Sequence, residues 1–183
     1  MISNLLEKNV RKVLTYFLIS PGSRYARKEI KEKTEMNNVP LDKTIIKLKS
    51  LRLITENKKL YSLNFNIEKN KEIFGIISSE YNYFNIPYKI FNILVEVVEK
   101  LSKNKGVKSA ILFGSYAKLI HVKNSDIDIA VIMKSKTRKQ IEKIKKEIDK
   151  FDDKTELHFF EEKDLKEKDP LIKDILKNGK IIL

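Results

Sequence analysis

ILFGSYAKLIHVKNSDIDIAVIM, residues 111–133, joins two apolar runs through a Gly-Ser pair and ends in a run that contains two aspartates. The pattern predicts a buried strand over 109–113, a sharp turn at Gly114-Ser115, a short helix to about His121, a polar turn over 123–125 and a second strand over 126–133. Glycine suits the sharp turn because it lacks a Cβ and tolerates positive φ. We therefore expect a strand, a turn, a helix and a second strand to follow one another in the second half of the chain.

The two aspartates predict a metal site. Asp126 and Asp128 lie two residues apart on a strand, so their carboxylates share one side while Ile127 and Ile129 point into the core. Like charges this close raise each other's pKa unless a cation neutralises them, and Mg²⁺ is the expected cation. The unpaired N–H groups of the helix that begins near Ser115 predict a phosphate site beside it.

The same residues resemble a known family. Over 107–160 the chain is similar to the DNA polymerase beta-like nucleotidyltransferases, which carry an apolar strand, a Gly-Ser pair and an Asp-x-Asp in a second apolar strand. The order of elements resembles the small, minimal members, which move a nucleoside monophosphate from an NTP to a hydroxyl of a small molecule, a protein or an RNA. The resemblance implies two Mg²⁺ ions, or Mn²⁺ in their place, and ATP as the expected nucleotide.

The resemblance also implies roles for single residues. It implies that the NTP phosphates are bound by Gly114, Ser115 and Lys118. It also implies that catalysis and metal binding fall to Asp126, Asp128 and Glu156. Glu156 stands on a predicted strand over 155–160, after a Lys-rich helix over 137–150, and His158 shares its face and competes for the third position. The chain departs from the family at Lys118-Leu119, where Arg-Gly is frequent, and at Glu156, where Asp is commoner.

The first third of the chain resembles a winged helix-turn-helix. Three helices are predicted. The first carries an apolar stripe at helical spacing: Leu6, Val10, Val13, Leu14, Phe17 and Leu18. The second covers 26–34, and Pro40 opens the third, in which one face holds Leu41, Ile45, Leu48 and Arg52. Two extended segments, 53–55 and 59–63, follow as a hairpin. In this family the third helix enters the DNA major groove, which implies DNA contacts by Lys43, Lys47 and Ser50, with Lys58 and Lys59 at the wing tip on phosphate. A winged helix used for protein contacts is the alternative.

The charge distribution agrees with a polyanionic partner. The chain carries 38 Lys and Arg against 25 Asp and Glu, and residues 1–65 hold 14 of the basic and only 6 of the acidic residues. A solvated Lys-rich surface is the alternative. The absence of cysteine, of a long apolar run and of a cleavable leader predicts a cytoplasmic protein without a membrane partner.

The predicted organisation is an α+β chain of three parts: a winged helix-turn-helix over 1–65, a helical linker over 66–106 that packs on the second domain, and a nucleotidyltransferase domain over 107–183. For the third part the resemblance implies a small mixed sheet flanked by helices. Aromatic residues in the linker, Tyr81, Tyr83, Phe84 and Tyr88, suit helix packing better than base stacking. The C-terminal segment to Asn178-Gly179 is expected to be core without chemistry.

Two functions follow from this organisation. The first is a Mg-dependent nucleotidyltransferase with a DNA-binding module, acting on a hydroxyl acceptor such as that of a cognate toxin protein. The second is a DNA-binding transcriptional regulator whose transferase fold is inactive or senses nucleotide.

Overall fold

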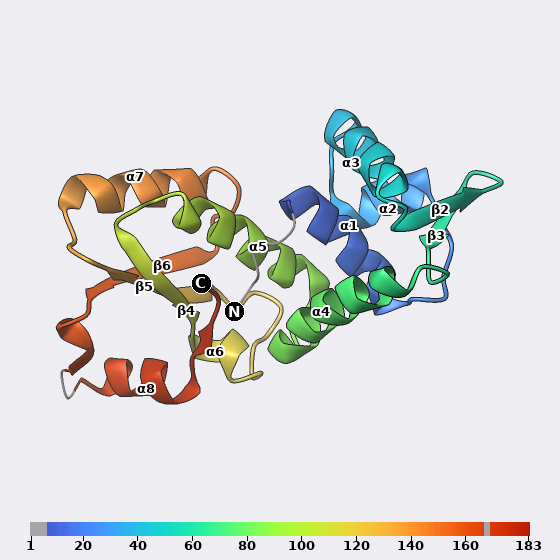
Figure 1. Cartoon of the computed structure of the whole chain (residues 1–183). Coiled ribbons are helices and arrows are strands. Elements are labelled where there is room, and N and C mark those ends of the chain that lie inside the picture. The colour runs from blue at the N-terminus through green and yellow to red at the C-terminus, as the bar shows by residue number, and fades with distance from the viewer. Residues whose placement is uncertain (1–6, 167–168) are drawn as a thin grey trace. The chain divides into compact units, whose positions relative to one another are not determined.

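A computed structural model describes residues 7–166 and 169–183. It divides the chain into two compact units, with the boundary between Tyr83 and Phe84 (Figure 1). Helices and two small sheets together confirm the α+β class. Leu6, expected in the first helical stripe, lies outside the described residues. No helix in the described part of the chain is both long and apolar enough to cross a bilayer.

The first unit combines helices with a three-stranded antiparallel sheet. Its elements are α1 (Lys8–Ile19), β1 (Tyr25–Ala26), α2 (Arg27–Thr34), α3 (Asn38–Ser50), β2 (Ile54–Asn57), β3 (Leu60–Leu63) and α4 (Glu68–Phe84). The strand order is β1-β3-β2. In the β2–β3 hairpin Asn57 pairs with Leu60, which leaves Lys58 and Lys59 as a two-residue turn.

Apolar side chains from these helices and from the sheet form the core of the first unit. Val13, Leu14, Phe17, Ile30, Leu41 and Leu48 are its most buried members. Arg11 of α1 is also buried, and its guanidinium donates to the carboxylate of Glu80 on α4. A buried charge is tolerated only when it is paired, so this ion pair ties α4 to α1.

The third helix differs from expectation at both ends. It begins at Asn38, two residues before Pro40, with Asn37 as the N-cap. Proline is accommodated there because the first N–H groups of a helix have no partner within it. Arg52, expected on the apolar face, follows the helix with φ 57° and is exposed, because its left-handed conformation turns the chain toward β2.

The segment expected as one helical linker is two helices. α4 is followed by α5 (Tyr88–Ser102), and the break falls at Asn85, with φ 51°, and Pro87, which is the N-cap of α5. Phe74 and Ile77 of α4 lie in the core of the first unit, whereas α5 belongs to the second. Phe84 is fully buried, with its ring centroid 5.9 Å from that of Phe91.

The second unit is built on a four-stranded mixed sheet of order β6-β5-β4-β7. Its strands and helices after α5 are β4 (Val107–Leu112), α6 (Gly114–Ala117), β5 (Ile127–Met133), α7 (Arg138–Asp149), β6 (Thr155–Glu161), the 3₁₀ turn η1 (Asp164–Lys166), α8 (Pro170–Asn178) and β7 (Lys180–Ile181). β5 runs parallel to β6, while β4 is antiparallel to both of its neighbours. The mixed sheet flanked by helices agrees with the sequence prediction.

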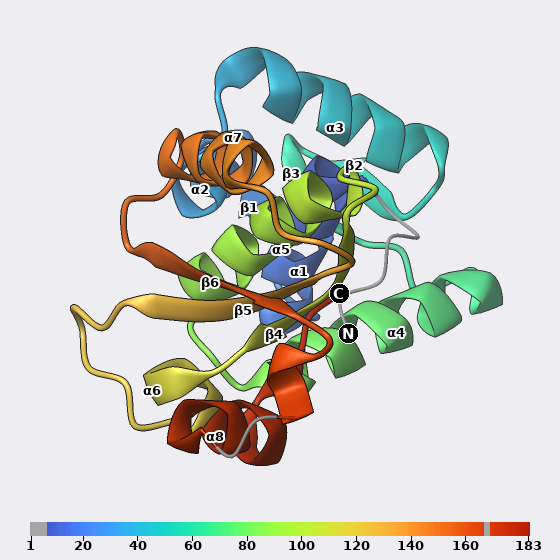
Figure 2. The same cartoon turned by 90° about the vertical axis from the view of Figure 1, so that its left-hand side faces the viewer.

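The sheet of the second unit has helices on both faces. Ala130 of β5 packs in a cluster with Phe113 and with Ile175 of α8. Met133 points to the other side, where its side chain lies beside Gly106 near Gln140 of α7. Figure 2 shows α5 and α7 on one side of the sheet and α6 and α8 on the other. Asp128 shares the face of Ala130, so it lies on the α8 side.

Candidate functional site

The Gly-Ser turn and the second aspartate are built against each other. β4 ends at Leu112, and the N–H of Phe113 donates to the backbone carbonyl of Asp128 across a distance of 2.9 Å. Gly114 follows with φ 68°, a left-handed conformation. A Cβ at Gly114 would lie 2.1 Å from Oδ2 of Asp128. Glycine is therefore required twice over, by its backbone conformation and by the closeness of the carboxylate.

Three potential metal ligands converge from β5 and β6. Parallel pairing sets Asp128 opposite Glu156 and Ala130 opposite His158, so the three polar side chains leave the same face of the sheet. Ligand atoms of Asp128, Glu156 and His158 lie within 4.8 Å of one another. Nε2 of His158 is 3.8 Å from an oxygen of Asp128 and 3.8 Å from an oxygen of Glu156.

The pKa of Asp128 is raised above its ordinary value. Burial is the largest cause, since it penalises the charged carboxylate. His158 opposes the shift, while the negative charges of Glu156 and Asp126 add to it. The cluster concentrates negative charge in a half-buried place, and a cation would relieve that repulsion.

The chemistry of the donor set fits a divalent metal. Nε2 of His158 is buried, and among the described residues it makes no hydrogen bond. The imidazole ring packs edge-on against Phe113, with 5.1 Å between the centroids. Buried polar atoms normally have partners, so an unbonded nitrogen facing two carboxylates is the kind of atom that a bound ion satisfies.

Asp126 lies just outside the close cluster. β5 begins at Ile127, one residue later than expected, and Asp126 is exposed in the preceding loop. That loop is fixed locally, because the hydroxyl of Ser125 accepts from the N–H of Val122. The negative charge of Asp126 contributes to the raised pKa of Asp128, so the two carboxylates are close enough to act on the same cation.

The residues expected to bind phosphate lie on and after a helix that is shorter than predicted. α6 is a single turn that starts at Gly114 and is shorter than the predicted helix to His121, because Leu119 adopts φ 60° and turns the chain. Nζ of Lys118 lies 2.8 Å from Oδ1 of Asp174 on α8, and this hydrogen bond lowers the pKa of Asp174. Sequence reasoning missed Asp174, since no pattern links α8 to the Gly-Ser turn.

The candidate DNA-binding residues on α3 lie on the surface of the first unit. Lys43, Lys47 and Ser50 are all exposed. Nζ of Lys47 is 2.7 Å from a carboxylate oxygen of Glu7, and the hydroxyl of Ser50 donates to the carbonyl of Lys47. The same helix exposes Ile46, with 67% of its surface accessible, which the sequence analysis did not single out.

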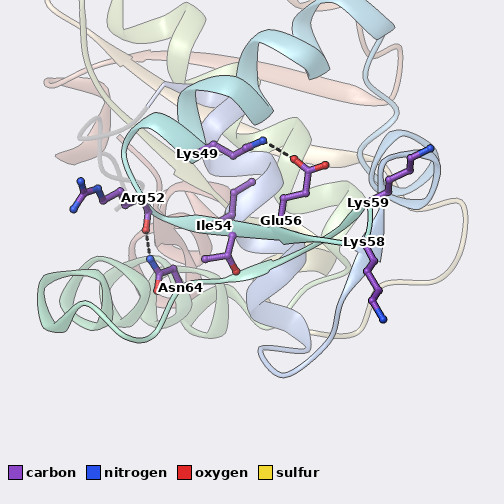
Figure 3. Close-up of a pocket in the computed structure, with 8 residues that line it drawn as sticks. Lys49, Arg52, Ile54, Glu56, Lys58, Lys59 and Asn64 are labelled. Carbon is purple, nitrogen blue, oxygen red and sulfur yellow. Dashed lines mark hydrogen bonds and ion pairs between the residues drawn. The ribbon is translucent and has the colours of Figure 1, made fainter.

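The hairpin carries the other two candidates at its turn. Lys58 and Lys59 have φ 50° and 63°, the backbone of a tight two-residue hairpin turn. Their side chains leave the turn in opposite directions (Figure 3). Behind the turn is an open pocket of about 550 Å³, which is lined by Lys49, Arg52, Ile54, Thr55, Glu56, Lys58, Lys59 and Asn64. Lys49 forms an ion pair with Glu56 there, and the other basic side chains in the lining are those of Arg52, Lys58 and Lys59.

Comparison with known proteins bears on the second unit. Residues 96–183 match the model of the family described as "Polymerase beta, Nucleotidyltransferase". The match covers the Gly-Ser turn, β5, β6 and α8, and it supports a polymerase beta-like nucleotidyltransferase domain and nucleotidyl transfer in general. No curated protein matches the chain significantly.

Proposed function

We propose that the chain is a Mg²⁺-dependent nucleotidyltransferase that moves a nucleoside monophosphate from an NTP to a hydroxyl acceptor. The observation that carries this proposal is the convergence of Asp128, Glu156 and His158 within 4.8 Å beside the Gly114 turn. Asp126 and Asp128 are the proposed ligands of two Mg²⁺ ions, with Glu156 as the third ligand and His158 as its competitor. Mn²⁺ would suit the same oxygen ligands.

The proposed reaction balances without further reactants. An acceptor hydroxyl oxygen bonds to the α-phosphorus of the NTP, the bond from that phosphorus to the bridging oxygen breaks, and pyrophosphate leaves. Glu156 takes the hydroxyl proton, because its carboxylate is exposed and directly opposite Asp128 in the sheet register. When bound, Mg²⁺ would neutralise charge on the phosphates and lower the pKa of the attacking hydroxyl.

The Gly114 turn is proposed to hold the triphosphate. Without a side chain at Gly114, a phosphate can approach the backbone, and the first N–H groups of the single-turn helix α6 have no partner within that helix. Lys118 would exchange its partner Asp174 for a phosphate oxygen. ATP is the proposed nucleotide, and a protein hydroxyl, such as that of a cognate toxin, is the proposed acceptor by analogy with minimal relatives.

The first unit is proposed to be a winged helix-turn-helix that binds double-stranded DNA. Its order of three helices, with a short strand after the first, and then a hairpin supports this proposal. α3 would enter the major groove with Lys43, Lys47 and Ser50, and the hairpin would bring Lys58 and Lys59 to the backbone. We propose 1–65 as this domain, followed by the helical segment 66–106 and the transferase domain 107–183.

A second function is favoured by one observation. Lys118 stands where the resemblance expects a phosphate-binding residue, and its ammonium is paired with Asp174. A site with that residue engaged fits a DNA-binding regulator that senses nucleotide without transferring it.

Transfer and sensing are separated by the position of the label in the nucleotide. The full chain is incubated with cell extract and Mg²⁺, using ATP labelled at the α-phosphate in one reaction and at the γ-phosphate in another. Nucleotidyl transfer predicts a macromolecule that carries the α-label without the γ-label and that is absent when Asp128→Asn replaces the parent chain. Binding of Mg-ATP without any labelled product would select the sensor.

A further inference from the structure

The second unit has a lysine-rich pocket on the side of the sheet away from Asp128. It lies between the end of α5 and α7, has a volume of about 630 Å³, and is lined by Lys100, Lys103, Asn104, Lys105, Gln140, Lys143, Glu147 and Lys150. Five of the eight lining residues are lysine and one is acidic. Lys103 pairs with Glu99, with 2.7 Å between the charged atoms, so a clear positive excess remains even when Glu99 is counted.

We propose that this pocket, the α5–α7 lysine pocket, binds the phosphodiester backbone of a nucleic acid. The proposal is independent of catalysis and of the DNA contacts proposed for α3. Its first support is charge, since the lining presents ammonium groups and neutral amides to an anion. Lysine acts as a point charge, which suits contacts to phosphate rather than recognition of a base.

The shape of the charged surface favours a polymer over a small anion. Lys139, Lys143, Lys146 and Lys150 recur at helical spacing along α7, and all four are exposed. From Lys139 to Lys150 the helix covers about 16 Å. In a B-form duplex the phosphates of one strand recur about every 3.4 Å along the helix axis, so this length matches about five of them.

The composition of the lining favours nucleic acid over an acidic protein. Protein interfaces have an apolar core that is rich in aromatic residues, whereas interfaces with nucleic acid are more polar and positively charged. Every residue that lines the pocket is Lys, Asn, Gln or Glu. The lack of an aromatic residue in this lining also argues for backbone contacts without base stacking.

The test removes three lysines from the pocket and the same number elsewhere. In the full chain, Lys105→Gln, Lys143→Gln and Lys150→Gln form the pocket variant. Lys154→Gln, Lys173→Gln and Lys177→Gln form the control, since these lysines are exposed and line neither described pocket. Both variants and their parent carry Lys43→Gln, Lys47→Gln, Lys58→Gln and Lys59→Gln, so that the duplex contacts proposed for the first unit are weakened equally in all three proteins.

Binding is measured by fluorescence anisotropy with labelled RNA and DNA single strands of about 20 nucleotides and with a DNA duplex, over a range of salt. The pocket variant should bind about tenfold more weakly or worse, and its slope of log K against log salt should shrink by about 2, while the control matches the parent. The probe that the parent binds most tightly shows whether the pocket prefers the backbone of RNA or of DNA.

Three outcomes would overturn the proposal. One is unchanged binding by the pocket variant. Another is an equal loss in pocket variant and control, which would mean that only total charge matters. The third is equally strong competition by poly-glutamate, which would mean a surface for acidic protein. An Asp128→Asn chain should bind the probes as the parent does, so loss of transferase activity and loss of this site are distinguishable.

Discussion

Replacing Gly114 by alanine tests the geometry of the candidate site. The added Cβ would lie 2.1 Å from Oδ2 and 3.0 Å from Cγ of Asp128, far inside contact distance. Alanine in the left-handed region costs about 1 to 2 kcal/mol, and a side chain forced off its rotamer costs about 0.5 to 1.5 kcal/mol. The expected loss of stability is therefore about 1.5 to 3.5 kcal/mol.

A thermal melt measures the loss of stability that Gly114→Ala causes, and a binding assay measures its effect on NTP affinity. In a unit of about 100 residues, one kcal/mol moves Tm by about 4 to 8 °C, so Tm should fall by about 6 °C or more. Mg-dependent NTP binding should weaken as well, because the carboxylate of Asp128 is displaced. Asp128→Ala removes Oδ2 and Cγ and leaves only Cβ of residue 128, at 3.2 Å. In an Asp128→Ala background, Gly114→Ala should therefore cost little more than the backbone term of about 1 to 2 kcal/mol.

Gly75→Ala is the matched control. Gly75 lies in α4, is exposed, and a Cβ there meets nothing within 4 Å. Alanine should stabilise this helix by about 0.5 to 1 kcal/mol. A Gly114→Ala protein with the Tm and NTP affinity of the parent would refute the placement of Asp128 against the turn.

Three further outcomes are expected. Burial raises the pKa of the Tyr16 hydroxyl to about 12. Because this folded-state pKa lies above the unfolded value, the contribution of Tyr16 to stability is complete below about pH 10 and is lost as the pH rises toward 12. Thermal melts should therefore show a smaller drop in Tm between about pH 10 and pH 12 for Tyr16→Phe than for the parent. Replacing both Lys43 and Lys47 by glutamine should weaken duplex binding at every sequence and reduce its salt slope by about 2, as filter binding over a salt series would show. Calorimetry should find weaker Mg-ATP binding in Lys118→Gln and tighter binding in Asp174→Asn, because the second change releases the ammonium of Lys118 from its partner. The opposite order of affinities would contradict a role for Lys118 in holding phosphate.

Local patterns predicted the centre of the second unit well. Alternating and continuous apolar runs mark β5 and β6 because strand period and burial leave a direct trace in sequence. Thr137 was placed at the start of a helix, and it caps α7 by accepting from Gln140. The spacing of Asp126 and Asp128 predicted a shared side, and the structure adds that Asp128 is the deeper of the two.

Long-range pairings were beyond the sequence. Glu156 and His158 could be placed on one strand face, but their closeness to Asp128 depends on the parallel register of β5 and β6. The pair of Lys118 with Asp174 joins residues that only the tertiary fold brings together. The same holds for Arg11 of α1, whose partner Glu80 comes from α4.

The predicted helix boundaries are wrong where residues other than glycine adopt the left-handed conformation. Asn85 breaks the expected linker helix, Arg52 ends the third helix early, and Leu119 shortens α6. Helix propensity excludes neither Arg52 nor Leu119 from a continuing helix, so it gives no sign of those two ends. Pro87, two residues after Asn85, is a local signal for the end of α4.

A metal-nucleotide site at Asp128 can be tested by calorimetric titration of Mg-ATP and the other Mg-NTPs into the full chain. We expect binding that requires Mg²⁺, that is lost in Asp128→Asn, and that is weakened in Asp126→Asn, while all three proteins stay folded by circular dichroism. Folded parent protein that binds no NTP, or an Asp128→Asn protein that binds as the parent does, would show that Asp128 does not hold such a site.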